Sequence, residues 1–340
     1  LELEDKCLSC HAPLGKFAAL HDGVDHYTMA MLAADTLAQD GVSCAACHQQ
    51  SPNGLGDFFS GELSFVEDTL YGQYGGSKDE DPIFGAPMFS FVGFEPIYGE
   101  HITKSELCAG CHTLITNTAD LEGELTGGTF VEQATYHEWL NSVYADELGP
   151  NHQECQGCHA PSINEEVVIS ANYAFLQPRS PYGLHYFVGA NTFMLEMLRD
   201  YGDTLGVTAT SAQFDSTITR TLDMLQNQSL TVELEELGLT QDTAMYKVTL
   251  HNLAGHKFPS GYPARRAFIE FKVSDLDGNT IFASGLMDDA YELTGQNPTY
   301  EPHYQVIRSE DEVQIYEQVM GDVNDNVTTV LERADHHIKD

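Results

Sequence analysis

The 340-residue chain contains eight cysteines, which form four pairs with two residues between the partners, and a histidine directly follows each pair. This Cys-x-x-Cys-His spacing is the attachment signature of a c-type haem. The two thiols bond to the two vinyl groups on one edge of a porphyrin, and the next residue then lies under the macrocycle, where its imidazole can bind the iron. The pairs are Cys7 and Cys10, Cys44 and Cys47, Cys108 and Cys111, and Cys155 and Cys158. The expected proximal iron ligands are His11, His48, His112 and His159.

Paired cysteines also occur in zinc ribbons, in redox dithiols and in disulfide frameworks. A zinc ribbon does not require a histidine after each second cysteine, and the four pairs leave no cysteine over for a disulfide. The sequence therefore predicts four covalently attached haem c groups.

The second axial ligand of each iron decides the function. Fifteen histidines less the four in the motifs leave eleven further candidates. Two histidine ligands give a closed, low-spin iron suited to electron transfer, whereas one protein ligand leaves the iron open for substrate chemistry. We therefore consider an electron conduit first. A multihaem oxidoreductase with an open catalytic haem, acting on a nitrogen or sulfur oxyanion, and a soluble periplasmic electron shuttle are the alternatives.

The charge of the chain bears on its partners. With 52 Asp and Glu against 15 Lys and Arg, the formal net charge is −37. Such a chain is a poor partner for nucleic acid or for an anionic membrane surface, and it repels oxyanion substrates. Carboxylates are also hard oxygen ligands, so residues 275–279 and 322–326 leave calcium open as an additional ligand. Short Asp, Asn and Gly runs of this kind are more often turns.

The location follows from the haem chemistry. Covalent haem attachment takes place outside the cytoplasmic membrane, so we expect a protein of the periplasm or beyond the cell. The first cysteine is Cys7, and no basic and then apolar leader precedes it, as expected for a mature form after signal-peptide cleavage. No apolar stretch of about 18 residues or more exists, so we expect no membrane insertion.

The pattern changes near residue 205. Residues 1–205 hold all four motifs and predict a tetrahaem domain with little regular structure, in which the macrocycles replace much of the core. Residues 206–340 predict a helix followed by an antiparallel β-sandwich-like domain. The expected helices are residues 27–39, 191–201 and 211–226. The expected strands are residues 229–237, 244–252, 267–274, 280–284 and 313–319.

The order of several segments resembles that of the filament-forming tetrahaem cytochromes of the OmcE type. These segments are residues 40–43 before the second motif, His101 followed by 105–107, then 132–139, 185–191 and 255–266. The fourth motif continues with Ala160 and Pro161 where the resemblance leads us to expect Met and Pro. A short tail beyond Asp340 is also expected from it.

The resemblance implies bis-histidine ligation of every haem, stacked haems, and head-to-tail polymerisation of copies of the chain into an extracellular wire. Its electron partners would be other redox proteins or extracellular acceptors. It also suggests His101, His185 and His256 as distal ligands, the last of them delivered by the C-terminal domain. His101 is too close in sequence to the third motif to bind that iron, so we expect it at a neighbouring one. His21 or His26 is the candidate fourth ligand, and it could come from the next subunit.

Overall fold

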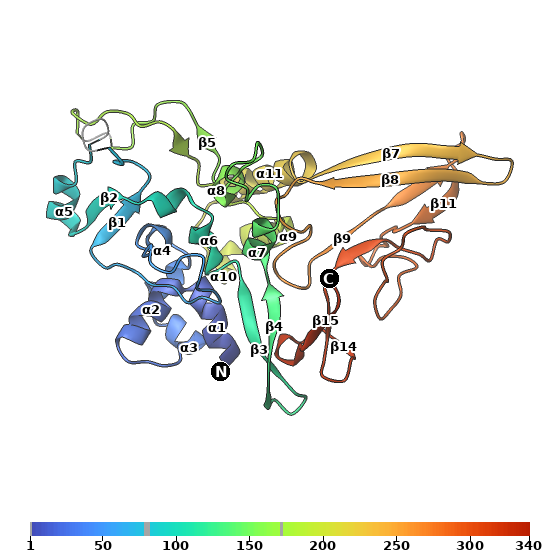
Figure 1. The fold of residues 1–340 in the computed structure, drawn as a ribbon, viewed down its shortest axis with the longest axis horizontal. Helices are drawn as coiled ribbons and strands as arrows, with labels where there is room; N and C mark the ends of the chain where they lie inside the picture. Colours follow the sequence, from blue (N-terminus) through green and yellow to red (C-terminus); the bar gives the residue numbers. More distant parts are fainter. Residues whose placement is uncertain (1, 78–81, 171–172) are drawn as a thin grey trace.

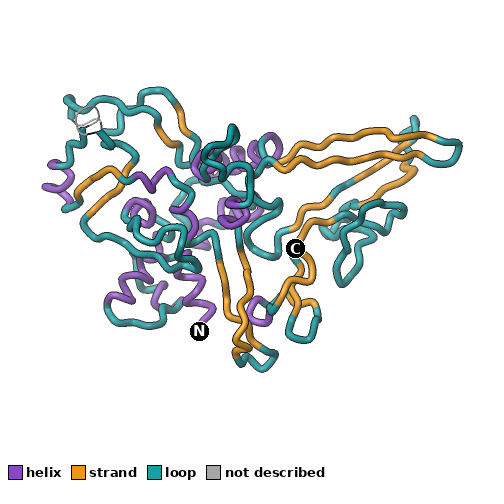
Figure 2. The backbone as a smooth tube through the Cα atoms, in the orientation of Figure 1, coloured by secondary structure: helices purple, strands orange, loops and turns teal. Residues whose placement is uncertain are grey.

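The computed structural model describes residues 2–77, 82–170 and 173–340. Short helices and small sheets alternate along an elongated molecule (Figure 1). The helices gather in the N-terminal and central parts, whereas the C-terminal part is built mainly from strands (Figure 2). The four motifs therefore lie in the part that contains most of the helices.

Two helices form the N-terminal corner, α1 (Glu2–His11) and α2 (Pro13–His21). Asp5 on α1 forms an ion pair with Lys16 on α2, and the side chains of both residues are largely buried. The same carboxylate accepts a hydrogen bond of 2.6 Å from the backbone of Tyr27, which is itself buried. One carboxylate thus joins both helices to the segment that follows them.

The expected helix over residues 27–39 is wrong. The structure has a short α3 (Met29–Leu32) and a 3-10 turn, η1 (Ala38–Asp40), with a break between them. Asp35 lies in the break, and its Oδ1 accepts hydrogen bonds from the backbone N–H groups of Leu37 and Ala38. An Asp side chain that bonds the backbone two and three residues ahead competes with helix continuation and starts a new turn.

The central part holds the last three motifs. Parallel strands β1 (Thr69–Gly72) and β2 (Glu95–Tyr98) pair with each other, and the antiparallel β3–β4 hairpin comes after the third motif. The elements here are α4 (Cys44–His48), α5 (Ala86–Val92), η2 (Glu100–Thr103), α6 (Glu106–Ala109), β3 (Leu114–Ala119), β4 (Leu125–Gln133), α7 (Thr135–Leu140), α8 (Cys155–His159), β5 (Ser162–Ile163) and β6 (Tyr182–Gly183).

Two helices lead into the C-terminal part and confirm the sequence prediction. They are α9 (Thr192–Asp200) and α11 (Ser211–Asn227), with the short α10 (Gly202–Leu205) between them. A capping box formed by Thr210 and Gln213 begins α11. Arg199 on α9 pairs with Asp215 on α11 at 2.8 Å and ties the two helices together.

The expected β-sandwich is not confirmed, because the described strands form separate sheets of two or three strands. The expected strand over residues 267–274 is two strands, since its halves pair with different partners. Strand β7 (Leu230–Leu239) pairs with β8 (Ala244–Asn252), and β9 (Arg266–Phe268) pairs with β12 (Ile315–Glu317). Strand β10 (Phe271–Ser274) pairs with β11 (Thr280–Ser284). Strand β13 (Val319–Gly321) pairs with both β14 (Val327–Thr328) and β15 (His336–Lys339). The 3-10 turn η3 (Leu331–Arg333) lies between β14 and β15.

The apolar core consists of small, separate clusters. One cluster around Ala109, Tyr136 and Trp139 lies beside the third motif. Another joins Phe130 on β4 to Met320 and holds the central hairpin against the C-terminal part. Large apolar side chains are correspondingly exposed over much of the surface.

Candidate functional site

A helical turn positions each Cys-x-x-Cys-His motif. The first motif ends α1, the second and fourth form α4 and α8, and the third begins in α6. In the third motif the His112 amide donates to the Cys108 carbonyl at 2.9 Å, which continues the turn to the histidine. In a helical turn the first cysteine and the histidine, four residues apart, lie on one face. Every motif therefore presents a thiol and an imidazole in the same direction.

The first and third motifs lie next to each other. The thiols of Cys10 and Cys111 are in hydrogen-bonding contact, and this contact together with burial raises the pKa of Cys111. Gly61 lies between the two motifs, and its amide donates to the Gly110 carbonyl at 2.8 Å. A Cβ at Gly61 would lie 2.4 Å from the Ser9 Cβ, and its φ is +78°, so only glycine fits this close approach.

The third and fourth motifs are joined by a clamp, here called the Ser105–Glu154 clamp. Glu154 accepts hydrogen bonds from the Ser105 amide at 2.9 Å and from its hydroxyl at 2.6 Å, and Lys104 adds an ion pair at 3.2 Å. The Cys155 amide in turn donates to the Ser105 hydroxyl at 3.0 Å. Burial alone would raise the pKa of Glu154, but the bonds from Ser105 and Lys104 lower it overall. The thiols of Cys108 and Cys155 are in contact across this clamp.

The second motif faces a second histidine. The rings of His48 and His185 have their centroids 6.2 Å apart at an interplanar angle of 33°. His48 Nδ1 lies 2.6 Å from the Tyr71 carbonyl, and His185 Nδ1 lies 3.0 Å from the Gly183 carbonyl. Because a carbonyl oxygen only accepts, each Nδ1 carries a proton, and the tautomer this selects for the neutral imidazole has its lone pair on Nε2.

The fourth motif repeats this arrangement. His159 and His256 have ring centroids 6.5 Å apart and nearly parallel planes, at 16°. His159 Nδ1 lies 2.9 Å from the Val188 carbonyl, and His256 Nδ1 lies 2.8 Å from the Lys257 carbonyl. These contacts again select the tautomer whose lone pair is on Nε2. Burial, the largest cause, lowers the pKa of His159, so its imidazole is neutral, as metal ligation requires.

The structure places the remaining predicted ligands differently. His101 donates from Nε2 to the Gln50 carbonyl at 3.1 Å and packs against Tyr71, beside the second motif. His21, at the end of α2, and His26 are exposed, and so is His11 of the first motif. Within the described residues, the rings of His101, His21 and His26 have no contact with the ring of a motif histidine. Their roles as ligands stay predictions.

His112 lies in a hollow. Its surface is exposed, yet desolvation by the surrounding protein is the largest cause that lowers its pKa, followed by the charges of His159 and Arg265. Both facts hold for a side chain that is surrounded by protein but not covered by it. The thiols of Cys7, Cys44 and Cys158 are exposed as well. An apolar macrocycle bonded to such thiols would fill this kind of space, so the motif residues fit haem.

Sequence reasoning missed three residues near the motifs. Glu154 precedes the fourth motif directly, and that position was the only signal for its role. His137 Nδ1 is 3.2 Å from the Thr113 hydroxyl, and its ring packs against Phe59. Arg265 influences His112 from a distant part of the chain, which spacing alone does not reveal.

The candidate calcium loops are turns. Asp275 Oδ1 accepts hydrogen bonds from the backbone amides of Asp277 and Asn279. Asp322 Oδ1 accepts hydrogen bonds from the backbone amides of Asn324 and Asn326. Within residues 2–77, 82–170 and 173–340, no group of three or more His, Cys, Asp or Glu side chains is placed to hold a metal ion. None of the helices in these ranges is long and apolar enough to cross a bilayer.

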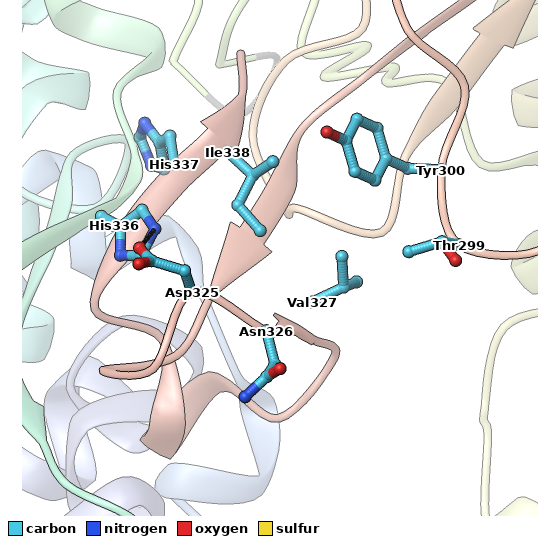
Figure 3. Close-up of a pocket in the computed structure, with 8 residues that line it drawn as sticks. All are labelled: Thr299, Tyr300, Asp325, Asn326, Val327, His336, His337 and Ile338. Atoms are coloured by element: carbon cyan, nitrogen blue, oxygen red, sulfur yellow. Dashed lines mark ion pairs between the residues drawn. The ribbon is translucent and has the colours of Figure 1, made fainter.

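A groove near the C-terminus contains none of the predicted haem-binding residues, but Asp325 and Asn326 of the candidate calcium segment 322–326 line it (Figure 3). In it, His336 Nε2 lies 3.3 Å from a carboxylate oxygen of Asp325, an exposed residue. The lining residues are Thr299, Tyr300, Asp325, Asn326, Val327, His336, His337 and Ile338.

Comparison with known proteins supports the fold. No protein-family model matches the chain, and no curated protein matches it. The structure is similar to the crystal structure of a penta-heme cytochrome c552 from Thermochromatium tepidum, with a TM-score of 0.54 and 16% sequence identity. The match covers 98% of this chain and 68% of that chain. The fold resembles that of a multihaem cytochrome. At this level of identity the likeness concerns the fold alone.

Proposed function

We propose that the chain is an electron-transfer protein that carries one covalent haem c at each of its four motifs. The observation that carries this proposal is the pairing of His48 with His185 and of His159 with His256. Two imidazoles that bind one metal from opposite sides, with metal–nitrogen bonds of about 2 Å, have ring centres about 6 Å apart. The observed separations are 6.2 and 6.5 Å.

The second shell of these pairs supports the same function. A metal-ligating histidine usually donates its other ring N–H to a carbonyl or carboxylate, which fixes its tautomer and orientation. All four paired imidazoles have such a carbonyl at Nδ1. Bound haem supplies an iron that alternates between two oxidation states. Each of the two histidine pairs would hold one such iron closed and low-spin, so that it exchanges electrons and binds no substrate.

The haem count is the first test. Intact-mass measurement of properly matured protein should show four haem additions, and acid-acetone extraction should leave the colour with the protein. The variant C155S/C158S should lose one addition and keep the other three. Fewer than four additions in the unaltered protein would contradict the assignment of at least one motif.

We further propose that copies of the chain assemble head to tail into an extracellular filament that passes electrons to other redox proteins or acceptors outside the cell. The support is the resemblance of the segments named above and the exposed His11, His21 and His26 near one end of the chain. A heterologous interface that does not close into a ring generates an open fibre. The net charge of −37 opposes association, so we expect filaments at moderate salt, where repulsion is screened.

Electron microscopy of the purified protein at moderate salt tests assembly. Ordered filaments would support the proposal. Sedimentation of only monomers, with every haem already low-spin, would contradict it and support a soluble shuttle instead.

A further inference from the structure

The loop of residues 255–266 is held against α7. The Lys257 amide donates to Glu138 Oε2 at 3.0 Å, and the Ser260 hydroxyl donates to the same oxygen at 2.7 Å. The Ser260 and Thr135 hydroxyls lie 2.8 Å apart. The first turn of α7 is bonded to the third motif, since the Tyr136 amide donates to the carbonyl of His112 at 3.1 Å. The loop that carries His256 therefore also lies beside the third motif.

This loop brings a guanidinium group to the third motif. Arg265 Nη1 donates to the Ser260 carbonyl at 2.7 Å. A Cβ built on Gly261 would lie 2.8 Å from this Nη1 and 3.9 Å from Gln133 Oε1, so the guanidinium lies close to the end of β4. Gln133 pairs with Leu114, two residues after His112. The Arg265 guanidinium therefore lies close to the chain segment that follows His112.

Arg265 forms no ion pair with any described residue, although the chain has 52 Asp and Glu against 15 Lys and Arg. Its neighbours differ. Arg266 pairs with Glu317 at 2.8 Å, and Lys257 pairs with Asp340 at 2.5 Å. A guanidinium has five N–H donors in a planar fork that matches a carboxylate. Among the described residues, the Arg265 guanidinium donates a hydrogen bond only to the backbone carbonyl of Ser260. The fork is therefore open to an anion beside the third motif.

We propose that Arg265 binds a propionate of the haem attached at the third motif. This inference rests on the proposed function, which supplies the haem. The bond is a charge-assisted contact of the kind that arginine makes with carboxylates. A cation next to a haem stabilises the reduced form, which carries one more electron, relative to the oxidised form. Arg265 thereby raises the reduction potential of that haem above the value it would have without the arginine.

The test is a potentiometric titration, followed by visible absorption, of the haem-loaded protein and three variants. R265Q should keep all four haems and the low-spin spectrum, while one component of the titration moves to a more negative potential. Loss of the partner also raises the pKa of the propionate. The reduction potential of the affected haem should therefore vary with pH over a higher pH range than in the unaltered protein. R265K keeps the charge and loses the fork, so its shift should lie between those of the unaltered protein and R265Q.

R266Q is the matched control, because it removes the same charge from the neighbouring residue, whose side chain pairs with Glu317. It should leave the titration close to that of the unaltered protein. Identical titrations for R265Q and R266Q would overturn the proposal. If R265Q fails to mature, a titration of R265K that coincides with that of the unaltered protein would overturn it as well. Absence of covalent haem from the unaltered protein would instead contradict the proposed function.

Discussion

The second and fourth motifs differ from the first and third in what faces their histidines. His48 and His159 each have a second imidazole at the distance expected across one metal ion, and each comes with a carbonyl at Nδ1. Within the described residues, His11 and His112 have no ring contact with a further imidazole. They lie instead in motifs whose thiols, Cys10 and Cys111, touch each other.

The difference separates two ways of completing an iron site. A later segment folds back to bring His185 or His256 to an earlier motif, so on the proposed function the two paired sites would be completed within the chain. His11 of the first motif is exposed, which suits the ligand from another copy that the filament proposal invokes. On this account, replacing a paired distal histidine and replacing an N-terminal histidine have different consequences.

The largest effect is expected for His256. H256A should convert one haem from low-spin to high-spin, because the fourth iron loses its sixth ligand, and H185A should do the same at the second. Low-temperature electron paramagnetic resonance of the oxidised protein measures the high-spin fraction. The control is H251A, since His251 is an exposed residue of β8 whose ring lies near Glu233. An unchanged spectrum in H256A would remove this residue from the ligand set.

Replacement of the N-terminal histidines should act through assembly. If His21 or His26 crosses to the next copy, H21A or H26A should abolish filaments and leave one haem high-spin. A metal–ligand bond between two copies of the chain resists dissociation, so the unaltered protein should stay low-spin on dilution. Microscopy and spin state are read on the same sample. Filaments with unchanged spectra in both variants would exclude a crossing ligand from this region.

A large high-spin signal in the unaltered resting protein would favour the oxidoreductase alternative.

The Ser105–Glu154 clamp should have a moderate effect on stability. E154Q weakens a charge-assisted hydrogen bond to the fully buried Ser105, which should lower the free energy of unfolding by about 1–3 kcal/mol. The folded-state pKa of Glu154 is lowered, so its contribution is present above the ordinary Glu pKa and is lost as pH falls through the folded value. Unfolding by denaturant should therefore differ between the two proteins at neutral pH and converge in acid.

The control for the clamp is E147Q. Glu147 lies 3.7 Å from the same Lys104, but its side chain is 72% exposed, so the variant should unfold within about 0.5 kcal/mol of the unaltered protein. Equal losses in E154Q and E147Q would show that general charge, rather than the clamp, joins the third and fourth motifs.

The smallest effect is expected for the calcium loops. The Asp275 and Asp322 carboxylates accept hydrogen bonds from backbone amides of their own turns, so a cation is not needed to hold them. Removing divalent cations with a chelator should leave the unfolding midpoint and the haem spectrum unchanged. A clear drop of the midpoint, restored by added calcium, would show that these turns bind the ion.

Haem attachment is a local requirement of five consecutive residues, so the motif spacing predicts the thiols and the proximal histidines. These assignments stay predictions until the haem content is measured. The helices expected over residues 191–201 and 211–226 are confirmed as α9 and α11. The prediction of one helix over residues 27–39 is wrong because the Asp35 side chain accepts a hydrogen bond from the Leu37 amide and interrupts the helix. The prediction of one strand over residues 267–274 is wrong because the two halves pair with different strands.

Contacts between distant segments account for the rest. The pairing of His48 with His185 and the approach of Arg265 to His112 depend on how loops fold back, and no local pattern specifies them. The sandwich was expected because each strand alternates polar and apolar residues. Alternation fixes which side chains share a face of a strand, but it does not fix which strands pair.

A structure of the haem-loaded protein at a resolution that shows the axial ligands would identify the residues that bind each iron. We expect one iron bound by Nε2 of His48 and of His185, and another bound by Nε2 of His159 and of His256, with all four residues from the same chain. An iron at the second or fourth motif whose second ligand is any other residue, or is absent, would contradict this expectation.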